Sequence, residues 1–313
     1  MATTDLVSLL SEGIKEHRGL EYKELDRVSD RIFKRDTTKS RFIDKKNMEL
    51  YGRPTRRRPG EGHRQGAIQE SFGKRFVMIG RGLADAIPIE DWNDDRYGVY
   101  HRMLPGKGGA LARAFNVDEE LVCAEFFMNL GYVSGTSVAG SFDGVAQFST
   151  AHPISLSNSG TTVANRPAAE VDISIAAADA ARTNMVTQLA ANNVERLQNS
   201  IKYHVCNPAT ARIARQVWNT EWERGTADRN TNIMKRYNVE VLEWAYFTKS
   251  GATGTNNAWF VIGESHGLEK WIREECDIMM DTDINTKSYV FVADYRMDVG
   301  SVDFRGTYGS TGA

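Results

Sequence analysis

His152 and Asp143 are the two residues whose types and spacing come nearest to a catalytic pair. A histidine can act as a general base when a nearby carboxylate orients its ring, and both lie in the stretch from Ser141 to Pro167. No Ser or Cys stands in a G-x-S-x-G setting that would supply a nucleophile. Pro153 also holds His152 in an extended conformation. We therefore expect a structural corner histidine.

The other candidate motifs are incomplete. His204 and Cys206 alternate on a predicted strand, so their side chains point the same way, but no further residues are spaced to complete a metal site. The glycines between 106 and 109 match neither common phosphate-binding pattern. Tryptophan and tyrosine lie within apolar periodic segments and not among Lys and Arg, which favours packing over base stacking. We expect no catalytic residue, metal or cofactor.

The cluster Arg56-Arg57-Arg58 is the strongest candidate for binding an anionic partner. Arginine pairs well with phosphate or carboxylate. Between 31 and 64 there are twelve Lys and Arg against four acids, whereas residues 264–283 hold seven acids against Lys270 and Arg273. The pattern alone leaves open a nucleic-acid patch, a solvated loop, or a clamp on an acidic surface of a neighbouring copy.

Composition is ordinary for a soluble globular protein of 313 residues, with 41% hydrophobic and 26% charged residues and a net charge of −2. No apolar run reaches the roughly 18 residues of a membrane span, and the N-terminus does not resemble a secretory signal. The three cysteines are widely spaced, so we expect neither a disulfide framework nor a CxxC metal site.

Periodicity predicts the elements of the first half of the chain. We expect a charged helix over 5–35, an exposed loop over 36–66, and a long β excursion with a basic tip over 45–90. A long helix should follow over 91–130, with Asp91 among its cap candidates and a break or kink at Pro105–Gly109.

In the second half we expect helices and strands to alternate before a final strand. Ser174 should cap a helix that runs to Ala191, and Asn207-Pro208 should join strand 201–206 to a helix whose Ile213 and Val217 face inward. Further predicted elements are strands over 239–247 and 258–262, an acidic helix over 266–275 and an alternating strand over 289–299.

Several of these segments, taken in order, resemble the major capsid proteins of tailed bacteriophages, and in particular their Mu-like head-subunit branch. The resemblance covers about residues 70–313. It is carried by Ile89-Glu90-Asp91, Asp94-Asp95-Arg96-Tyr97-Gly98, Phe148-Ser-Thr-Ala-His-Pro153, Asn207-Pro208 and the closing Asp303-Phe-Arg-Gly-Thr-Tyr-Gly-Ser310. It implies an α+β protein with the Hong Kong 97-type capsid fold.

The resemblance also implies a domain organisation. Residues 1–44 would form an N-terminal arm and the entry to the peripheral (P) domain, and 45–90 would form the extended loop (E-loop). The P domain would take 91–171 and 286–313, with the long helix as its spine, and the axial (A) domain would take 172–285. The predicted break at Pro105–Gly109 departs from a straight spine, and the chain has no long N-terminal scaffolding region.

The function implied is structural. Copies of the chain would form hexamers and pentamers of an icosahedral head, assembled in the bacterial host cytoplasm, around double-stranded DNA that is bound without sequence specificity. Portal, scaffolding and decoration proteins are further partners in this family. The alternative is an encapsulin-like compartment that holds enzyme cargo; an unrecognised enzyme is a third class, for which the sequence offers no coherent site.

The E-loop of this family lies over an adjacent subunit, which favours a contact between copies for the basic cluster. The arginines concerned are Arg53, Arg56, Arg57, Arg58 and Arg64. Their acidic partner could be the segment 264–283 or the acids that open the predicted spine, Asp91, Asp94 and Asp95, which the family arrangement slightly favours.

Overall fold

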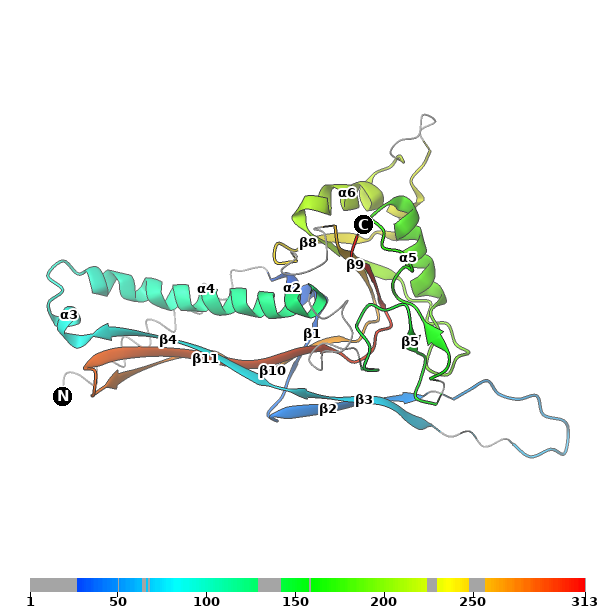
Figure 1. The fold of residues 1–313 in the computed structure, drawn as a ribbon, viewed down its shortest axis with the longest axis horizontal. Coiled ribbons are helices and arrows are strands. Elements are labelled where there is room, and N and C mark those ends of the chain that lie inside the picture. Colours follow the sequence, from blue (N-terminus) through cyan, green and yellow to red (C-terminus); the bar gives the residue numbers. More distant parts are fainter. Residues whose placement is uncertain are drawn as a thin grey trace.

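The protein is elongated, with a long arm, a compact lobe above its middle, and a hairpin that projects the other way (Figure 1). The computed structural model describes residues 27–49, 51–63, 66, 68–128, 142–157, 159–223, 230–247 and 257–312, and only the backbone from 99 to 108. Most of the helix predicted over 5–35 lies outside these ranges. The described part of that segment holds the short helix α2 (Val28–Ile32), followed by strand β1 (Lys34–Thr37).

A narrow sheet runs the length of the arm, and we call it the ribbon. Its strands lie in the order β1, β10 (Leu268–Asp283), β11 (Ser288–Ser301) and β4 (Ile79–Pro88). The strand predicted over 289–299 is confirmed as the centre of β11, which buries alternate side chains from Tyr289 to Val299 on one face. Period-two alternation of this kind gives a sheet one apolar face, which needs a cover.

The cover is helix α4 (Val99–Met128), which lies along the ribbon. Two predictions about this region are wrong. The helix continues through Pro105, because a proline near the helix start removes a single hydrogen bond and the later turns are held by packing of Phe115 and Phe127 in the core. Asp91 does not cap it either: residues 91–93 end a separate short helix, α3 (Ile89–Asn93), and a turn precedes α4.

The predicted acidic helix over 266–275 is also wrong, because this segment lies in β10. Leu268, Lys270 and Ile272 are buried at strand spacing, and β10 pairs with β11 from Leu268 to Asp283. Pairing along a neighbouring strand overrides the weak local preference of a charged segment. Most of the acidic residues that suggested a helix surface are instead exposed side chains of strand β10.

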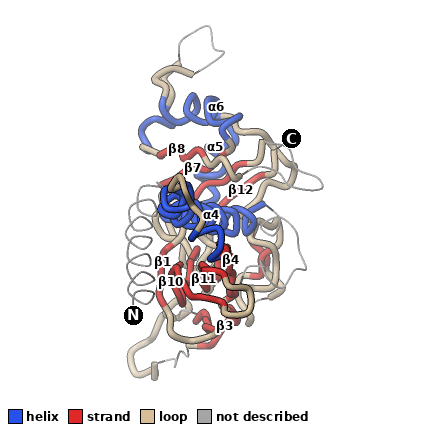
Figure 2. The backbone as a smooth tube through the Cα atoms, turned by 90° about the vertical axis from the view of Figure 1, so that its left-hand side faces the viewer, coloured by secondary structure: helices blue, strands red, loops and turns tan. Residues whose placement is uncertain are grey.

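The upper lobe is a second sheet with helices on it. Its strands lie in the order β12 (Thr307–Ser310), β9 (Trp259–Gly263), β7 (Ile201–Cys206) and β8 (Glu240–Glu243). Helices α5 (Ile175–Thr187), α6 (Pro208–Asn219) and the 3-10 helix η1 (Ile233–Tyr237) complete it. Figure 2 shows α4 between this lobe and the ribbon.

Most local predictions for the lobe are confirmed. Ser174 accepts a hydrogen bond from the Ala177 amide at the start of α5, although the helix ends at Thr187 and not at Ala191. Asn207 caps α6 with Pro208 as its first residue. Strands β7 and β9 match their predictions, whereas the strand expected over 239–247 is only four residues long.

One prediction about side-chain direction in α6 is wrong. Ile213 is 41% exposed, while Val217 is buried as expected. The buried stripe of α6 is built instead from smaller residues and one tryptophan at helical spacing: Thr210, Ala211, Ala214, Val217 and Trp218. At about 100° per residue, Ile213 lies beside this stripe, about 40° around the helix from Val217 and about 100° from the centre of the stripe, so its side chain is partly exposed.

The β excursion is confirmed as a two-stranded hairpin that leads into the ribbon. It consists of β2 (Phe42–Glu49) and β3 (Gln69–Val77), and β4 follows directly. A small antiparallel pair, β5 (His152–Pro153) with β6 (Thr162–Val163), lies at the base of the upper lobe. Within the described part of the chain, no helix is both long and apolar enough to cross a membrane.

Candidate functional site

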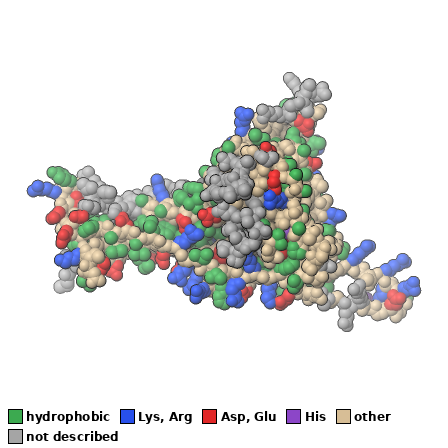
Figure 3. Space-filling model, viewed as in Figure 1, with side chains coloured by type: hydrophobic (Ala, Val, Ile, Leu, Met, Phe, Trp, Pro, Cys, Tyr) green, Lys and Arg blue, Asp and Glu red, His purple; other side chains and the backbone are tan. Residues whose placement is uncertain are grey.

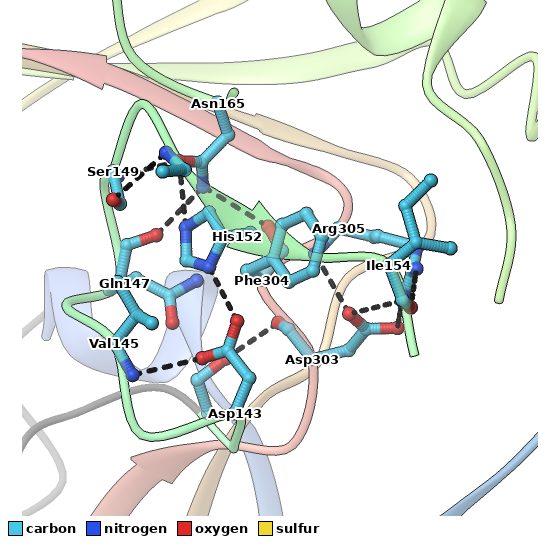
Figure 4. A network of polar contacts seen from close by, with 12 residues as sticks. Asp143, Val145, Gln147, Ser149, His152, Ile154, Asn165, Asp303, Phe304 and Arg305 are labelled. Carbon is cyan, nitrogen blue, oxygen red and sulfur yellow. Dashed lines mark hydrogen bonds and ion pairs between the residues drawn. The ribbon is translucent and has the colours of Figure 1, made fainter. Parts of the chain in front are cut away.

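His152 lies at the centre of a closed polar network (Figure 4). Its ring is fully buried and stacks on Phe304, with 4.0 Å between the ring centroids. Its Nδ1 lies 2.7 Å from Asp143 Oδ2, and its Nε2 lies 3.1 Å from Asn165 Oδ1. Because both ring nitrogens face oxygen atoms of the protein and the ring is buried, the histidine cannot reach a substrate as a general base. The expectation of a structural corner is confirmed.

The network around His152 joins two distant parts of the chain. The Asn165 amide group donates to the Gln147 carbonyl at 2.7 Å, and Asn165 Oδ1 accepts from the Ser149 amide at 2.9 Å. Arg305, also buried, donates to the Leu189 and Ile154 carbonyls, each at 2.7 Å. These bonds hold the loop between 142 and 165 against the C-terminal segment of the chain. They also give the buried polar groups of the loop the hydrogen-bond partners that such groups need.

His204 and Cys206 are buried in the upper lobe. Burial lowers the pKa of His204 to about 3 and raises that of Cys206 to about 12, so both side chains are neutral near pH 7. His204 stacks on Trp259, as a core residue does. Among the residues that the structure describes, no three His, Cys, Asp or Glu side chains come together as metal ligands would.

A ring of four charges around the buried Lys270 and Glu119 was missed by sequence reasoning; one of its members, Asp30, has a side chain that is 37% exposed. Lys270 is 0% exposed, and its ammonium lies 2.5 Å from Asp30 and 2.6 Å from Glu119. Arg27 pairs with the same two carboxylates, so positive and negative groups alternate around the ring. The sequence did contain a sign that Lys270 is buried. Lys270 lies two residues from Leu268 and two from Ile272, so in a strand all three side chains point to the same, apolar face.

The ring joins the start of the described chain to α4 and to the ribbon. Burial by itself raises the pKa of the Asp30 carboxyl, but Lys270 and Arg27 outweigh it and hold this pKa below its usual value. Glu120, next to the ring, accepts from the Ser29 amide at 3.0 Å and from the Trp244 indole at 2.7 Å. This cluster therefore holds α2, α4, β10 and the upper lobe together.

The basic cluster is fully exposed. Residues 51–63, with Arg53 and Arg56–Arg58, form the tip that joins β2 to β3, and all of them are exposed. The contacts of Arg57 and Arg58 are local: Arg57 Nη1 lies 2.6 Å from His63 Nε2, and the Arg58 amide donates to Glu61 at 3.0 Å. At the base of the tip, the Asn192 side chain donates to the Tyr51 carbonyl at 3.1 Å. Arg64 lies outside the described residues.

The acids named with this cluster lie at the other end of the molecule. Asp91 is in α3, and Asp94 and Asp95 are in the turn after it. In Figure 3 red carboxylates gather at the left end of the arm, whereas the tip at the right carries blue side chains around a single red group. The basic tip and these acids therefore cannot meet within one chain.

The sequence itself matches no family model and no curated protein. The fold, in contrast, matches solved capsid structures. Compared with the asymmetric unit of the bacteriophage PhiM1 mature capsid, the TM-score is 0.55 at 12% identity, over 91% of this chain and 86% of the other. A structure titled Microbacterium phage Oxtober96 gives 0.54 at 10% identity, over 92% of both chains.

A third comparison points the same way. The capsid of a native GTA particle gives a TM-score of 0.54 at 13% identity, over 92% of both chains. These likenesses cover about nine tenths of the chain. The protein is an α+β chain with the Hong Kong 97-type fold of phage capsid subunits.

Proposed function

We propose that this chain is the major capsid subunit of a tailed phage or prophage. Copies would assemble into hexamers and pentamers of an icosahedral head in the bacterial cytoplasm and enclose double-stranded DNA. The observation that carries the proposal is the likeness to phage and GTA capsid subunits over nine tenths of the chain. The closed network at His152 agrees with it, because the residue pair closest to a catalytic site is used for structure.

Each proposed domain of the subunit corresponds to a part of this fold. The hairpin and its tip would be the E-loop (45–90), and α4 with the far part of β11 would belong to the P domain (91–171 and 286–313). The upper lobe would be the A domain (172–285), although its sheet also takes in β12 and β10 runs from it into the ribbon. Residues 1–44 would form the N-terminal arm and the P-domain entry, anchored at the charge ring around Lys270.

The charges at the two ends of the subunit supply an orientation for assembly. Arg53 and Arg56–Arg58 at the tip, together with Arg64 further along the sequence, would contact Asp91, Asp94 and Asp95 of the next copy. Two different surfaces that match in this way make a head-to-tail contact, which closes into rings. An exposed ion pair contributes only about 0.2–1 kcal/mol, but the contact is repeated around every ring.

The near-neutral subunit also suits a shell that encloses DNA. A net charge of −2 gives the lining little attraction for phosphates, so the shell can hold DNA without gripping it. Portal, scaffolding and decoration proteins would be partners at particular positions of such a shell.

The test is electron microscopy of the protein expressed alone and with its neighbouring phage genes. We expect capsomers or closed shells. A subunit that stays monomeric in all these conditions contradicts the proposal. If shells form, their contents decide what kind of shell it is: DNA and a portal support a phage head, whereas a packaged enzyme identifies an encapsulin-like compartment.

The acidic partner of the tip can be identified by charge reversal. Substituting Arg56, Arg57 and Arg58 by Asp should prevent assembly. Lysines introduced at 91, 94 and 95 should then restore it, because they recreate the attraction with the signs exchanged. Rescue by lysines at 275, 277 and 281, on the exposed side of β10, would assign the contact to the ribbon instead.

A further inference from the structure

The hairpin of β2 and β3 is attached to the rest of the subunit at two places of opposite character. The first is apolar and lies where the hairpin meets the ribbon. Phe76 of β3 is 2% exposed and stacks on Trp271 of β10, with 4.2 Å between the ring centroids. Gly300 of β11 leaves room for this ring, since a Cβ there would lie 2.3 Å from the Phe76 side chain. We call this close-packed attachment the hinge.

The second attachment is polar and lies further out, where the hairpin contacts the loop that follows β5 (Figure 1). The carboxylate of Glu49, the last residue of β2, accepts from the Ser157 hydroxyl at 2.6 Å and from the Ser157 amide at 3.1 Å. The Ser71 hydroxyl of β3 accepts from the Leu156 amide at 3.3 Å. Burial raises the pKa of the Glu49 carboxyl, but the hydrogen bonds from Ser157 and Ser155 outweigh it and hold this pKa below its ordinary value. We call this attachment the latch.

The loop that carries the latch is itself held firmly in the lobe. It continues directly from His152 and Pro153, and both ring nitrogens of His152 face oxygen atoms of the protein. The buried Arg305 donates to the Ile154 carbonyl at 2.7 Å, two residues before the latch begins. Satisfied buried networks of this kind restrict the backbone around them. The His152 corner therefore supplies a fixed support against which the hairpin rests.

A hollow of about 410 Å³ lies beside the latch, between the hairpin and the lobe. Its walls include Met48 and Phe72 of the hairpin, Ile154 of the corner and Leu197 of the loop after α5. Met48 is 64% exposed and Leu197 38%, so the two sides are not packed together. Parts of a protein that are joined permanently leave few voids of this size. The hollow gives the hairpin space to change its angle.

We propose that the latch is a releasable restraint: Glu49 and Ser71 hold the hairpin against the corner loop in one orientation, and their release lets the whole hairpin turn about Phe76. The bond from Asn192 to the Tyr51 carbonyl belongs to the same attachment. Water can replace partly exposed hydrogen bonds, whereas the buried hinge must stay closed. Rings of five and six copies meet at different angles, so an adjustable hairpin suits a shell. That use rests on the proposed function; the latch itself is a property of one subunit.

Hydrogen exchange of the unassembled protein tests whether these contacts release together. In Glu49→Ala the Ser157 amide loses its acceptor, so the informative amide is that of Leu156, whose own partner Ser71 is still present. If the latch is one unit, the Leu156 amide should exchange at least about tenfold faster in this variant than in the wild type. The Met78 amide, which is bonded close to the hinge, should keep its rate.

The matched control is Glu70→Ala, which removes an exposed carboxylate from the same hairpin. Glu70 pairs with Lys46 on the facing strand and not with the lobe, so the Leu156 amide should exchange as in the wild type. Equal Leu156 rates in Glu49→Ala and the wild type would overturn the latch. Because the protein is unassembled, this result is independent of whether wild-type shells form, which tests the capsid function separately.

A distance measurement detects the movement itself. Spin labels at Thr55→Cys in the tip and Asp179→Cys on α5 report the angle between hairpin and lobe, since both positions are exposed. The native cysteines are buried and should not react. With labelled chains diluted in unlabelled ones, we expect one narrow distance distribution, which becomes broader when Ser157→Ala is added. A distribution that stays narrow with Ser157→Ala and also with Glu49→Ala would mean that the hinge alone sets the angle, and would contradict the proposal.

Discussion

Charged side chains are buried in the middle of this molecule and exposed at its two ends. In the middle, Lys270 and Arg305 are buried, and each has partners within the chain. At the ends, the arginines of the tip and the acids of α3 face outward. The comparison suggests that charges satisfied within the chain determine the shape of the subunit, whereas those left outside determine how copies meet.

The energies of the two kinds of charge differ for a physical reason. Water screens an exposed ion pair, so its loss costs little, but a buried charge that loses its partner retains the whole cost of desolvation. Substitutions in the middle should therefore act on folding, and substitutions at the ends should act on assembly. The following predictions test this difference, beginning with the largest expected effect on the stability of the subunit.

Lys270→Ala should have the largest effect. It leaves Glu119 and Asp30 with Arg27 as their remaining cation in the ring, and we expect the free energy of unfolding to fall by about 3–5 kcal/mol. Urea unfolding of the isolated subunit measures this loss. The control is Lys45→Ala, which breaks the partly exposed pair with Glu269 and should cost less than about 1 kcal/mol. Equal losses of unfolding free energy in the two variants would contradict the distinction between buried and exposed charges.

His152→Ala should come next. Asp143 and Asn165 lose a buried partner and Phe304 loses its stacked ring, so we expect a loss of about 2–4 kcal/mol in the free energy of unfolding. Denaturant unfolding and the yield of soluble protein measure it. The control His63→Ala removes an exposed histidine of the tip and should leave folding unchanged. A hydrolase or transferase activity that disappears with His152→Ala while particles still form would refute the structural role.

Asp298→Asn should stabilise the subunit above pH 6. Burial raises the pKa of this carboxyl to about 6, against a hydrogen bond from the Val299 amide that lowers it. The folded chain therefore keeps the proton up to about pH 6, whereas the unfolded chain releases it near pH 4. The free energy of unfolding of the wild type should fall as the pH rises from about 4 to 6 and then stay level.

The asparagine variant lacks this titration. We expect it to be about 1–2 kcal/mol more stable than the wild type at pH 8 and equally stable near pH 4. Thermal unfolding followed across this pH range measures the difference. A variant that is less stable than the wild type at pH 8 would mean that attraction to Lys74 outweighs the burial of the Asp298 charge.

Substituting Arg56, Arg57 and Arg58 by Ser should have the smallest effect on folding, within about 0.5 kcal/mol, because all three side chains are exposed. Assembly should become weaker and less sensitive to salt, since the screened attraction is removed. Light scattering across a salt series measures this. Arg212→Ser, an exposed change on α6, serves as a control for charge loss. Unchanged assembly at every salt concentration would leave the tip as a solvated loop.

The sequence by itself determined the elements whose signals are local. Ser174 and Asn207 cap their helices because a short polar side chain can bond the first free amides wherever a helix begins. The alternation from Tyr289 to Val299 marks a strand with one buried face. The corner at His152 was also readable, since proline restricts the residue before it. The capsid fold was suggested by the resemblance of the sequence motifs between Ile89 and Ser310, taken in order, to those of phage capsid proteins.

Tertiary structure alone decided the features that depend on distant partners. Residues 266–275 are a strand because β11 pairs with them, and α4 runs through Pro105 while its later turns are held in the core. Lys270 was hidden in an acidic segment, because its partners Asp30 and Glu119 are more than a hundred residues away in the chain. Local propensities differ by less than the free energy that pairing and burial supply, so long-range contacts settle such segments.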